Sequence, residues 1–314
     1  MSDSRALVLL ALVALTSIVC FMVIGLRGNL TFVITLRAIK LLALVEVGIA
    51  IAVSTIIFQT VTANHILTPS IMGIDALYLF GQILLVFLFG GAAYASLNDS
   101  WKFLAEIVLL MMLTCGLMLP LLKARWDMGL VLLSGIIIGV LFRSLHSLIA
   151  RLIDPNDFAV VQAASFVNFN GVETNLLGAA TALTIGILIW VWRIRHTLDV
   201  VALGRDVAIS LGIDWKRMQL TLLLMVAALV SVSTALVGPV AFLGLLFVAL
   251  AERITGTRRH SVLIPVAALI AIIVLVGGQT AFQHALGNSS TLGVVIECVG
   301  GTVFLILLWR GSRK

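Results

Sequence analysis

The stretch VALGRDVAISLGIDWKRMQL (residues 201–220) interrupts a chain that is otherwise dominated by apolar runs. The run ending in ILIWVWRIRH (187–196) precedes it, and the run beginning with TLLLMVAALVSV (221–232) follows it. The stretch carries too many charges to cross a bilayer, yet it is too apolar for an ordinary hydrophilic loop. Its place between two apolar runs predicts a segment that lies at a membrane surface.

The composition of the whole chain indicates a membrane protein. Hydrophobic residues make up 61% of the 314 residues and charged residues only 11%, whereas soluble domains carry about 25% charged residues. A transmembrane helix needs about 20 predominantly apolar residues. We therefore predict an all-α polytopic membrane protein, a single domain over residues 1–314, with ten transmembrane helices at 6–26, 38–62, 75–95, 103–122, 128–147, 175–195, 218–236, 239–252, 262–281 and 292–309.

The basic residues predict the orientation of these spans. If the N-terminus is cytoplasmic, fourteen of the twenty Lys and Arg residues fall in cytoplasmic segments, as the positive-inside rule requires. Both termini and residues 201–220 are then cytoplasmic. The net charge of +6 is explained by this topology, so no nucleic-acid partner is expected.

Motifs for catalysis, nucleotide binding and metal binding are absent from the sequence. No G-x-x-x-x-G-K-[ST], H-E-x-x-H or G-x-S-x-G occurs. Cys20, Cys115 and Cys298 lie in apolar runs without metal-ligand spacing. We expect no catalytic residue, no metal site and no bound cofactor in this chain.

Residues 201–220 combine an apolar row with helix-ending signals. Leu203, Val207 and Leu211 recur every four residues and predict one apolar helical face. Gly212 stands where a left-handed residue would end the helix. One interpretation is an interfacial helix on lipid, and the other is a helix that docks onto a soluble partner.

The residues between the apolar positions favour docking. A lipid-bound helix would carry a basic polar face and a large aromatic anchor. Here the polar face has the opposite charges Arg205 and Asp206, and small residues such as Ala208 permit close contact with another protein.

Four motifs in the expected order resemble the permeases of bacterial ABC importers for iron-siderophores and vitamin B12. LGRDVAISLGI (203–213) resembles their L-G-x-x-x-A-x-x-L-G-V/I coupling motif, and TANHILTPSIMG (62–73) resembles their T-x-N-P-L-x-x-P-x-x-L-G loop. GPVAFLGL (238–245) resembles G-P-I-x-F-V-G-L, and LGVV (292–295) resembles the last motif. The chain departs from the family at Arg205 and Asp206, where most members carry two glutamates, and at His65, where a proline is usual.

The resemblance implies a type II ABC importer permease fold with ten spans and a cytoplasmic coupling helix within about residues 197–217. Such permeases work in pairs in the bacterial inner membrane. An ATPase dimer that uses ATP and Mg binds below them, and a periplasmic solute-binding protein docks above. Substrate moves from periplasm to cytoplasm by alternating access.

Segments 66–78, 154–158 and 166–170 resemble the subgroup that imports catecholate and related siderophores such as vibriobactin, enterobactin and petrobactin. In that subgroup the pore usually combines two different permeases, and this chain resembles the second of the pair. A homodimer is the alternative.

Site residues are carried over from the family where the motifs match. The cytoplasmic gate is expected at Asn64 and Ile66; the alternative is a plain helix-ending Asn. Docking of the binding protein is expected at Arg37 and Lys40, where the alternative is snorkelling to lipid headgroups. The resemblance assigns ATPase coupling to Leu203, Gly204, Arg205, Asp206, Val207, Ala208, Leu211 and Gly212.

Charged residues inside the predicted spans form the last group of candidates. Arg143, Glu46 and Glu297 lie at similar predicted depths, and His146 and Ser147 lie near Arg143. Arg143 could pair with Glu297 or Glu46, because an unpaired charge in the membrane is costly. The alternatives are that Arg143 and His146 face the transport pathway and offset the charge of a ferric catecholate, or that Arg143 snorkels.

A ten-span secondary transporter driven by an ion gradient is the competing class. Such proteins often contain midplane acids, for which Glu46, Glu106 and Glu297 are candidates. The sequence shows no convincing internal repeat, and that class does not explain residues 201–220. Co-purification of an ATPase separates the two classes.

Overall fold

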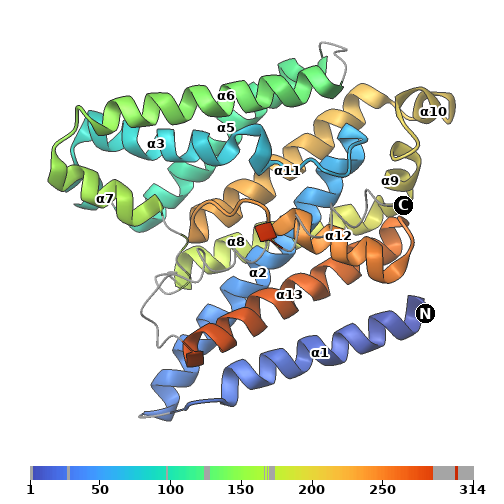
Figure 1. Cartoon of the computed structure of the whole chain (residues 1–314), viewed down its shortest axis with the longest axis horizontal. Coiled ribbons are helices and arrows are strands. Elements are labelled where there is room, and N and C mark those ends of the chain that lie inside the picture. Colours follow the sequence, from blue (N-terminus) through green and yellow to red (C-terminus); the bar gives the residue numbers. More distant parts are fainter. Residues whose placement is uncertain are drawn as a thin grey trace.

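The part of the chain that the structure describes is built of helices (Figure 1). A computed structural model describes residues 3–26, 29–96, 98–123, 128–165, 167, 169, 174–285 and 301–302. The helices are α1 (Asp3–Val23), α2 (Leu30–Thr62), η1 (Ser70–Met72), α3 (Ile74–Phe89), α4 (Gly91–Ser96), α5 (Asp99–Lys123), α6 (Met128–Ala150), α7 (Pro155–Ser165), α8 (Thr174–Arg193), α9 (Arg195–Val201), α10 (Arg205–Ser210), α11 (Trp215–Val237), α12 (Leu243–Thr255) and α13 (His260–Ala285).

Six of the described helices are long and apolar enough to cross a membrane: α1, α2, α6, α8, α11 and α13. The predicted span at 75–95 is wrong as a single helix, because Gly90 adopts φ +82° and separates α3 from α4. The predicted span at 239–252 corresponds to α12, a helix of 13 residues. The predicted tenth run, 292–309, lies outside the described residues except for 301–302.

Helix α2 forms the centre of the larger core. Its 33 residues pack against α1, α8, α11, α12 and α13. Small residues bring the helices close, as is common when lipid surrounds a bundle and dispersion contacts must hold it together. A Cβ on Gly48 would lie 3.0 Å from the Leu275 side chain of α13, and a Cβ on Gly244 of α12 would overlap the Thr55 side chain.

A second, smaller cluster is formed by α3, α4, α6 and α7, while α5 packs mainly against α11 of the larger core (Figure 1). Gly73, with φ +88°, precedes α3 and lies against α6: a Cβ on Gly73 would come within 2.7 Å of the Gly139 Cα. Helix α7 was not predicted from the sequence. Its first residue is Pro155, a residue that is common at the first helical position. The Asp154 carboxylate before it accepts a hydrogen bond from the Asn156 amide.

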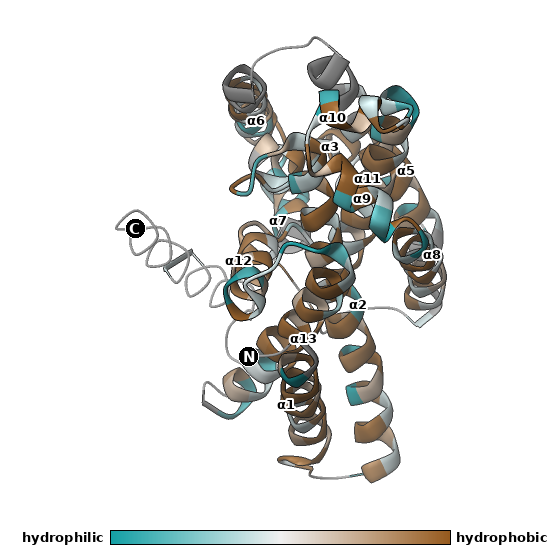
Figure 2. Cartoon of the chain, turned by 90° about the vertical axis from the view of Figure 1, so that its right-hand side faces the viewer, coloured by the Kyte–Doolittle hydropathy of each residue, from teal (hydrophilic) through white to brown (hydrophobic). Residues whose placement is uncertain are grey.

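The topology places α9, α10 and the N-terminal end of α1 at the same end of the helices (Figure 1). Figure 2 looks at that end, where hydrophilic segments lie around α9 and α10 while the long helices are mostly hydrophobic. The last turn of α2 and the first turn of α13 meet α9 here. This end therefore carries both the predicted coupling segment and the predicted gate.

Candidate coupling segment and cytoplasmic gate

The predicted coupling segment contains two short helices. Helix α9 ends at Val201, and α10 begins only at Arg205. Gly204 separates them with φ +96°, a conformation that favours glycine, and no other atom lies within 4 Å of where its Cβ would be. The predicted short amphipathic helix corresponds to α10, although Leu203 precedes its first residue and Leu211 is its C-cap.

The apolar side chains of this segment are nevertheless exposed together. Leu203 and Leu211 are each 61% exposed and Val207 is 44% exposed, whereas Ala208 is buried. Gly212 has φ +87°, so the predicted left-handed residue ends the segment. We call Leu203, Val207 and Leu211 the apolar row.

The exit from this segment is continuous with the next long helix. Helix α11 begins at Trp215, three residues before the predicted span 218–236. Asp214 is its N-cap, and the Asp214 carboxylate accepts a hydrogen bond of 3.2 Å from the Arg217 amide. A carboxylate at this position satisfies a free helix N–H group and fixes the direction in which the chain leaves α10.

The predicted gate residues lie in the loop that follows α2. Ala63 ends the helix with φ +47°, and the Asn64 side chain accepts a hydrogen bond of 3.0 Å from the Ile66 amide. The Ile66 side chain is left 54% exposed. The Gln59 amide of the last α2 turn donates to the His65 carbonyl at 2.8 Å, so the helix end holds the loop.

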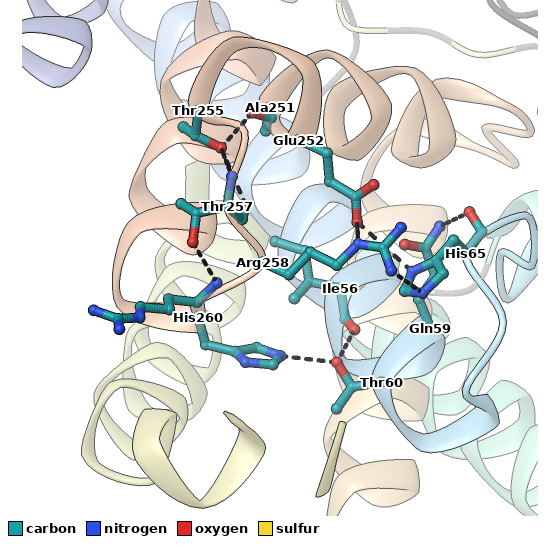
Figure 3. Close-up of polar contacts among 11 residues, drawn as sticks. Ile56, Gln59, Thr60, His65, Ala251, Glu252, Thr255, Thr257, Arg258 and His260 are labelled. Atoms are coloured by element: carbon teal, nitrogen blue, oxygen red, sulfur yellow. Dashed lines mark hydrogen bonds and ion pairs between the residues drawn. The ribbon is translucent and has the colours of Figure 1, made fainter. Parts of the chain in front are cut away.

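Residues from the α12–α13 connection reach the same loop (Figure 3). An Arg258 guanidinium nitrogen lies 2.9 Å from His65 Nε2, and Arg258 Nε lies 3.5 Å from the Glu252 carboxylate. His65 Nδ1 also lies 3.6 Å from that carboxylate. The residue that replaces the usual family proline, His65, thus joins the gate loop to α12.

His260, the first residue of α13, connects three helices. Its Nδ1 lies 2.7 Å from the Asp199 carboxylate of α9, which also accepts from the His260 backbone amide at 2.8 Å. Its Nε2 lies 2.8 Å from Thr60 Oγ1 of α2, and the residue is only 2% exposed (Figure 3).

A cavity of about 120 Å³ separates the gate loop from the coupling segment. Ala63 and His65 line it from the loop, and Ala202 lines it from the end of α9. Gln59, Thr60, Arg258 and His260 complete much of the wall. Sequence reasoning missed this network, since its contacts join residues up to 200 positions apart. The available signal was only that Asp199 and His260 flank apolar runs on the predicted cytoplasmic side.

At the opposite end of α2, the two predicted docking residues have different surroundings. The Arg37 guanidinium donates at 2.8–3.2 Å to the carbonyls of Phe21 and Met22 in the last turn of α1 and of Ile24 and Gly25 just after it. Lys40 is 8% exposed. Arg37 therefore also holds α1 against α2.

The predicted buried charges are not brought together among the described residues. Glu46 accepts hydrogen bonds from the Thr181 and Thr184 hydroxyls of α8, at 2.7 and 3.2 Å, rather than pairing with Arg143. Arg143 and Ser147 are exposed on α6. His146 Nε2 is buried and has no hydrogen-bond partner in the described part of the chain. Glu297 lies outside the described residues.

The helical architecture and the apolar spans define the class of protein: a polytopic α-helical membrane protein. The structure is similar to a solved metal-chelate type ABC transporter in an inward-facing conformation, with a TM-score of 0.84, 18% identity and coverage of 98% of this chain and 99% of that one. At this identity the likeness concerns the fold.

The sequence identifies the family. The model of the FecCD transport family matches residues 5–310, and the chain belongs to this family. Its relatives include the petrobactin import system permease protein YclO of Bacillus subtilis, 43% identical over 91% of both chains. The petrobactin import system permease protein FatC of Bacillus anthracis is 30% identical over 88% of this chain and 79% of its own length. The resemblance drawn from the four motifs is confirmed.

Proposed function

We propose that this chain is a permease subunit of an ATP-driven importer that carries a ferric siderophore of the petrobactin type into the cytoplasm. The observation that carries the proposal is the 43% identity with the petrobactin permease YclO over 91% of both chains. The proposal keeps ten membrane spans, with α3 (Ile74–Phe89) in place of the predicted run 75–95, and both termini cytoplasmic. Petrobactin belongs to the catecholate and related siderophores that segments 66–78 and 154–158 indicated.

The proposed complex contains a second, homologous permease, an ATPase dimer and a periplasmic siderophore-binding protein. The apolar row offers the ATPase an exposed hydrophobic contact, a common way for a helical segment to enter a groove on a partner. ATP and Mg bind to the ATPase in this proposal. Asn64 and Ile66 narrow the pathway, and alternating access moves the siderophore inward.

The test is uptake into proteoliposomes that contain the two permeases and the ATPase, with the binding protein outside. We expect ATP-dependent uptake of radioiron-labelled ferric petrobactin and no uptake of vitamin B12. Uptake that needs a proton gradient but no ATP would favour the secondary transporter instead. ATP-dependent uptake of vitamin B12 alone would contradict the proposed substrate.

Native mass spectrometry of the purified complex tests the pairing of permeases. We expect one copy of this chain, one copy of a different permease and two ATPase subunits. A complex with two copies of this chain and full uptake activity would replace the heterodimer by a homodimer.

A further inference from the structure

Helices from three distant parts of the sequence meet at His260. The imidazole lies 2.7 Å from the Asp199 carboxylate through Nδ1 and 2.8 Å from the Thr60 hydroxyl through Nε2. It is 2% exposed, so little water competes for these contacts. The two ring nitrogens thus join α9, which leads into the coupling segment, to α2, which leads into the gate loop.

The contact between Asp199 and α13 is stronger than a single hydrogen bond. The same carboxylate oxygen accepts from the His260 backbone amide at 2.8 Å, so Asp199 acts as an N-cap contributed by another helix. A carboxylate at a helix N-terminus also interacts favourably with the helix dipole. A displacement of α9 is therefore expected to displace the first turn of α13 with it.

The other side of the network holds the gate loop at two points. Thr60 is adjacent to Gln59, whose amide holds the His65 carbonyl at 2.8 Å. Arg258, two residues before His260, lies 2.9 Å from the His65 ring. The N-terminal region of α13 is therefore connected to the gate loop both through α2 and directly.

His260 and Thr60 line a cavity of about 120 Å³, and α9 also packs directly against α2 beside it. The cavity lies between Ala202 at the end of α9 and Ala63 in the gate loop, so the two segments face each other across a space. The polar contacts of His260 and Arg258 run along its wall.

From this arrangement we infer that Asp199, His260 and Thr60 form a relay that transmits motion of the ATPase-docking segment to the cytoplasmic gate. His260 is a positioning residue in the relay. This role presupposes that the chain docks an ATPase, as proposed above. The relay acts when nucleotide binding moves α9 and α10, since the Asp199 carboxylate then pulls on α13 and, through His260, on the end of α2.

A matched pair of substitutions at Thr60 tests the relay with little change of shape. Thr60→Val removes the hydroxyl, while Thr60→Ser keeps it. In the reconstituted complex, Thr60→Val should lower ferric petrobactin uptake per ATP hydrolysed by about tenfold, because it removes the hydroxyl that lies 2.8 Å from His260 Nε2 and 2.8 Å from the Ile56 carbonyl. Thr60→Ser should transport like the wild type, and hydrolysis itself should continue in both variants.

Substitutions at His260 test each ring nitrogen. An Asn side chain places its amide near the position of Nδ1 and a Gln side chain near that of Nε2. His260→Asn can keep the Asp199 contact and His260→Gln the Thr60 contact, and each should uncouple hydrolysis from uptake. His284→Ala, near the other end of α13 and outside the network, is the control and should leave coupling unchanged.

A direct readout of the gate distinguishes a relay from a general loss of stability. With Ile66→Cys and a cysteine in the partner permease, crosslinking should depend on nucleotide in Thr60→Ser and lose that dependence in Thr60→Val. Normal coupling in both Thr60→Val and His260→Gln would overturn the relay. A wild-type complex that binds no ATPase would instead overturn the proposed function.

Discussion

Arg37 was predicted to dock the binding protein because it is a cation near the outer surface. In the structure it also stabilises the fold by holding α1 against α2. Its guanidinium donates to two carbonyls in the last turn of α1, where helix carbonyls lack partners within the helix, and to two carbonyls just after the helix. The planar fork of five N–H donors suits such a cluster, whereas a lysine ammonium would reach fewer of these carbonyls. The sequence placed Arg37 near the outer surface, but it did not show that the C-terminal end of α1 would contact Arg37.

The substitution Arg37→Lys separates the structural role from docking. It keeps the charge and loses most of the four contacts, so we expect the permease to be destabilised by about 1–3 kcal/mol. Thermal unfolding of the purified permease in detergent measures this loss. Stimulation of ATP hydrolysis by the binding protein should survive, since the charge remains.

The double variant Arg37→Gln with Lys40→Gln is the complementary test. It removes both charges, and we expect it to abolish stimulation by the binding protein if the two residues dock it. Full stimulation in this variant would leave Arg37 with its structural role alone.

At the scale of elements, the glycines of residues 201–220 predicted where helices end. Gly212 was expected to be left-handed because a glycine after an amphipathic run is a frequent helix end, and its φ of +87° confirms this. Gly204 also interrupts the helical pattern near its start in the sequence, and the structure has a break there between α9 and α10. Gly204 is the reason for the break: its φ of +96° lies outside the helical region.

The apolar row predicts the site where the ATPase binds. Leu211→Asp should abolish co-purification of the ATPase with the permease, because a carboxylate buried in a docking groove without a partner costs several kcal/mol. The abundance of the permease in membranes should be unchanged, since Leu211 is exposed in this chain.

Ile209→Asp provides the matched control for the apolar row. Ile209 is also exposed, but it lies about 200° around α10 from Val207 at 100° per residue. We expect Ile209→Asp to keep the ATPase. Retention of a full complement of ATPase by Leu211→Asp would show that the apolar row is not the docking surface.

At the scale of the whole molecule, the sequence predicted where most helices run but not how they meet. Continuous apolar runs reveal helices because every backbone N–H and C=O group in lipid must be satisfied within a segment. Contacts such as Gly73 with Gly139 and Gly244 with Thr55 join residues 66 and 189 positions apart, and no local pattern marks them. The relay at His260 was missed for the same reason.

Which group Arg143 contacts also depends on how helices that are distant in the sequence pack together. Arg143 is exposed on α6, and one guanidinium nitrogen lies 3.5 Å from where a Cβ of Gly139 would be. Glu46, one of its two expected partners, instead accepts hydrogen bonds from Thr181 and Thr184. These observations count against a pair with Glu46, and they leave a pair with Glu297, the transport pathway and snorkelling as the alternatives for Arg143.

Substitutions of Arg143 distinguish a role in the transport pathway from a salt bridge between Arg143 and a buried carboxylate. We expect Arg143→Gln to form a stable complex at normal abundance and to lose ferric petrobactin uptake by at least about tenfold, as when a charge-assisted contact is removed. Arg143→Lys keeps the charge and should retain part of the uptake. Adding Glu46→Gln should restore nothing, because the hydroxyls of α8 already satisfy that carboxylate. If Arg143→Gln with Glu297→Gln regains uptake, Arg143 pairs with Glu297 instead, since the second change removes the carboxylate that was left without a partner.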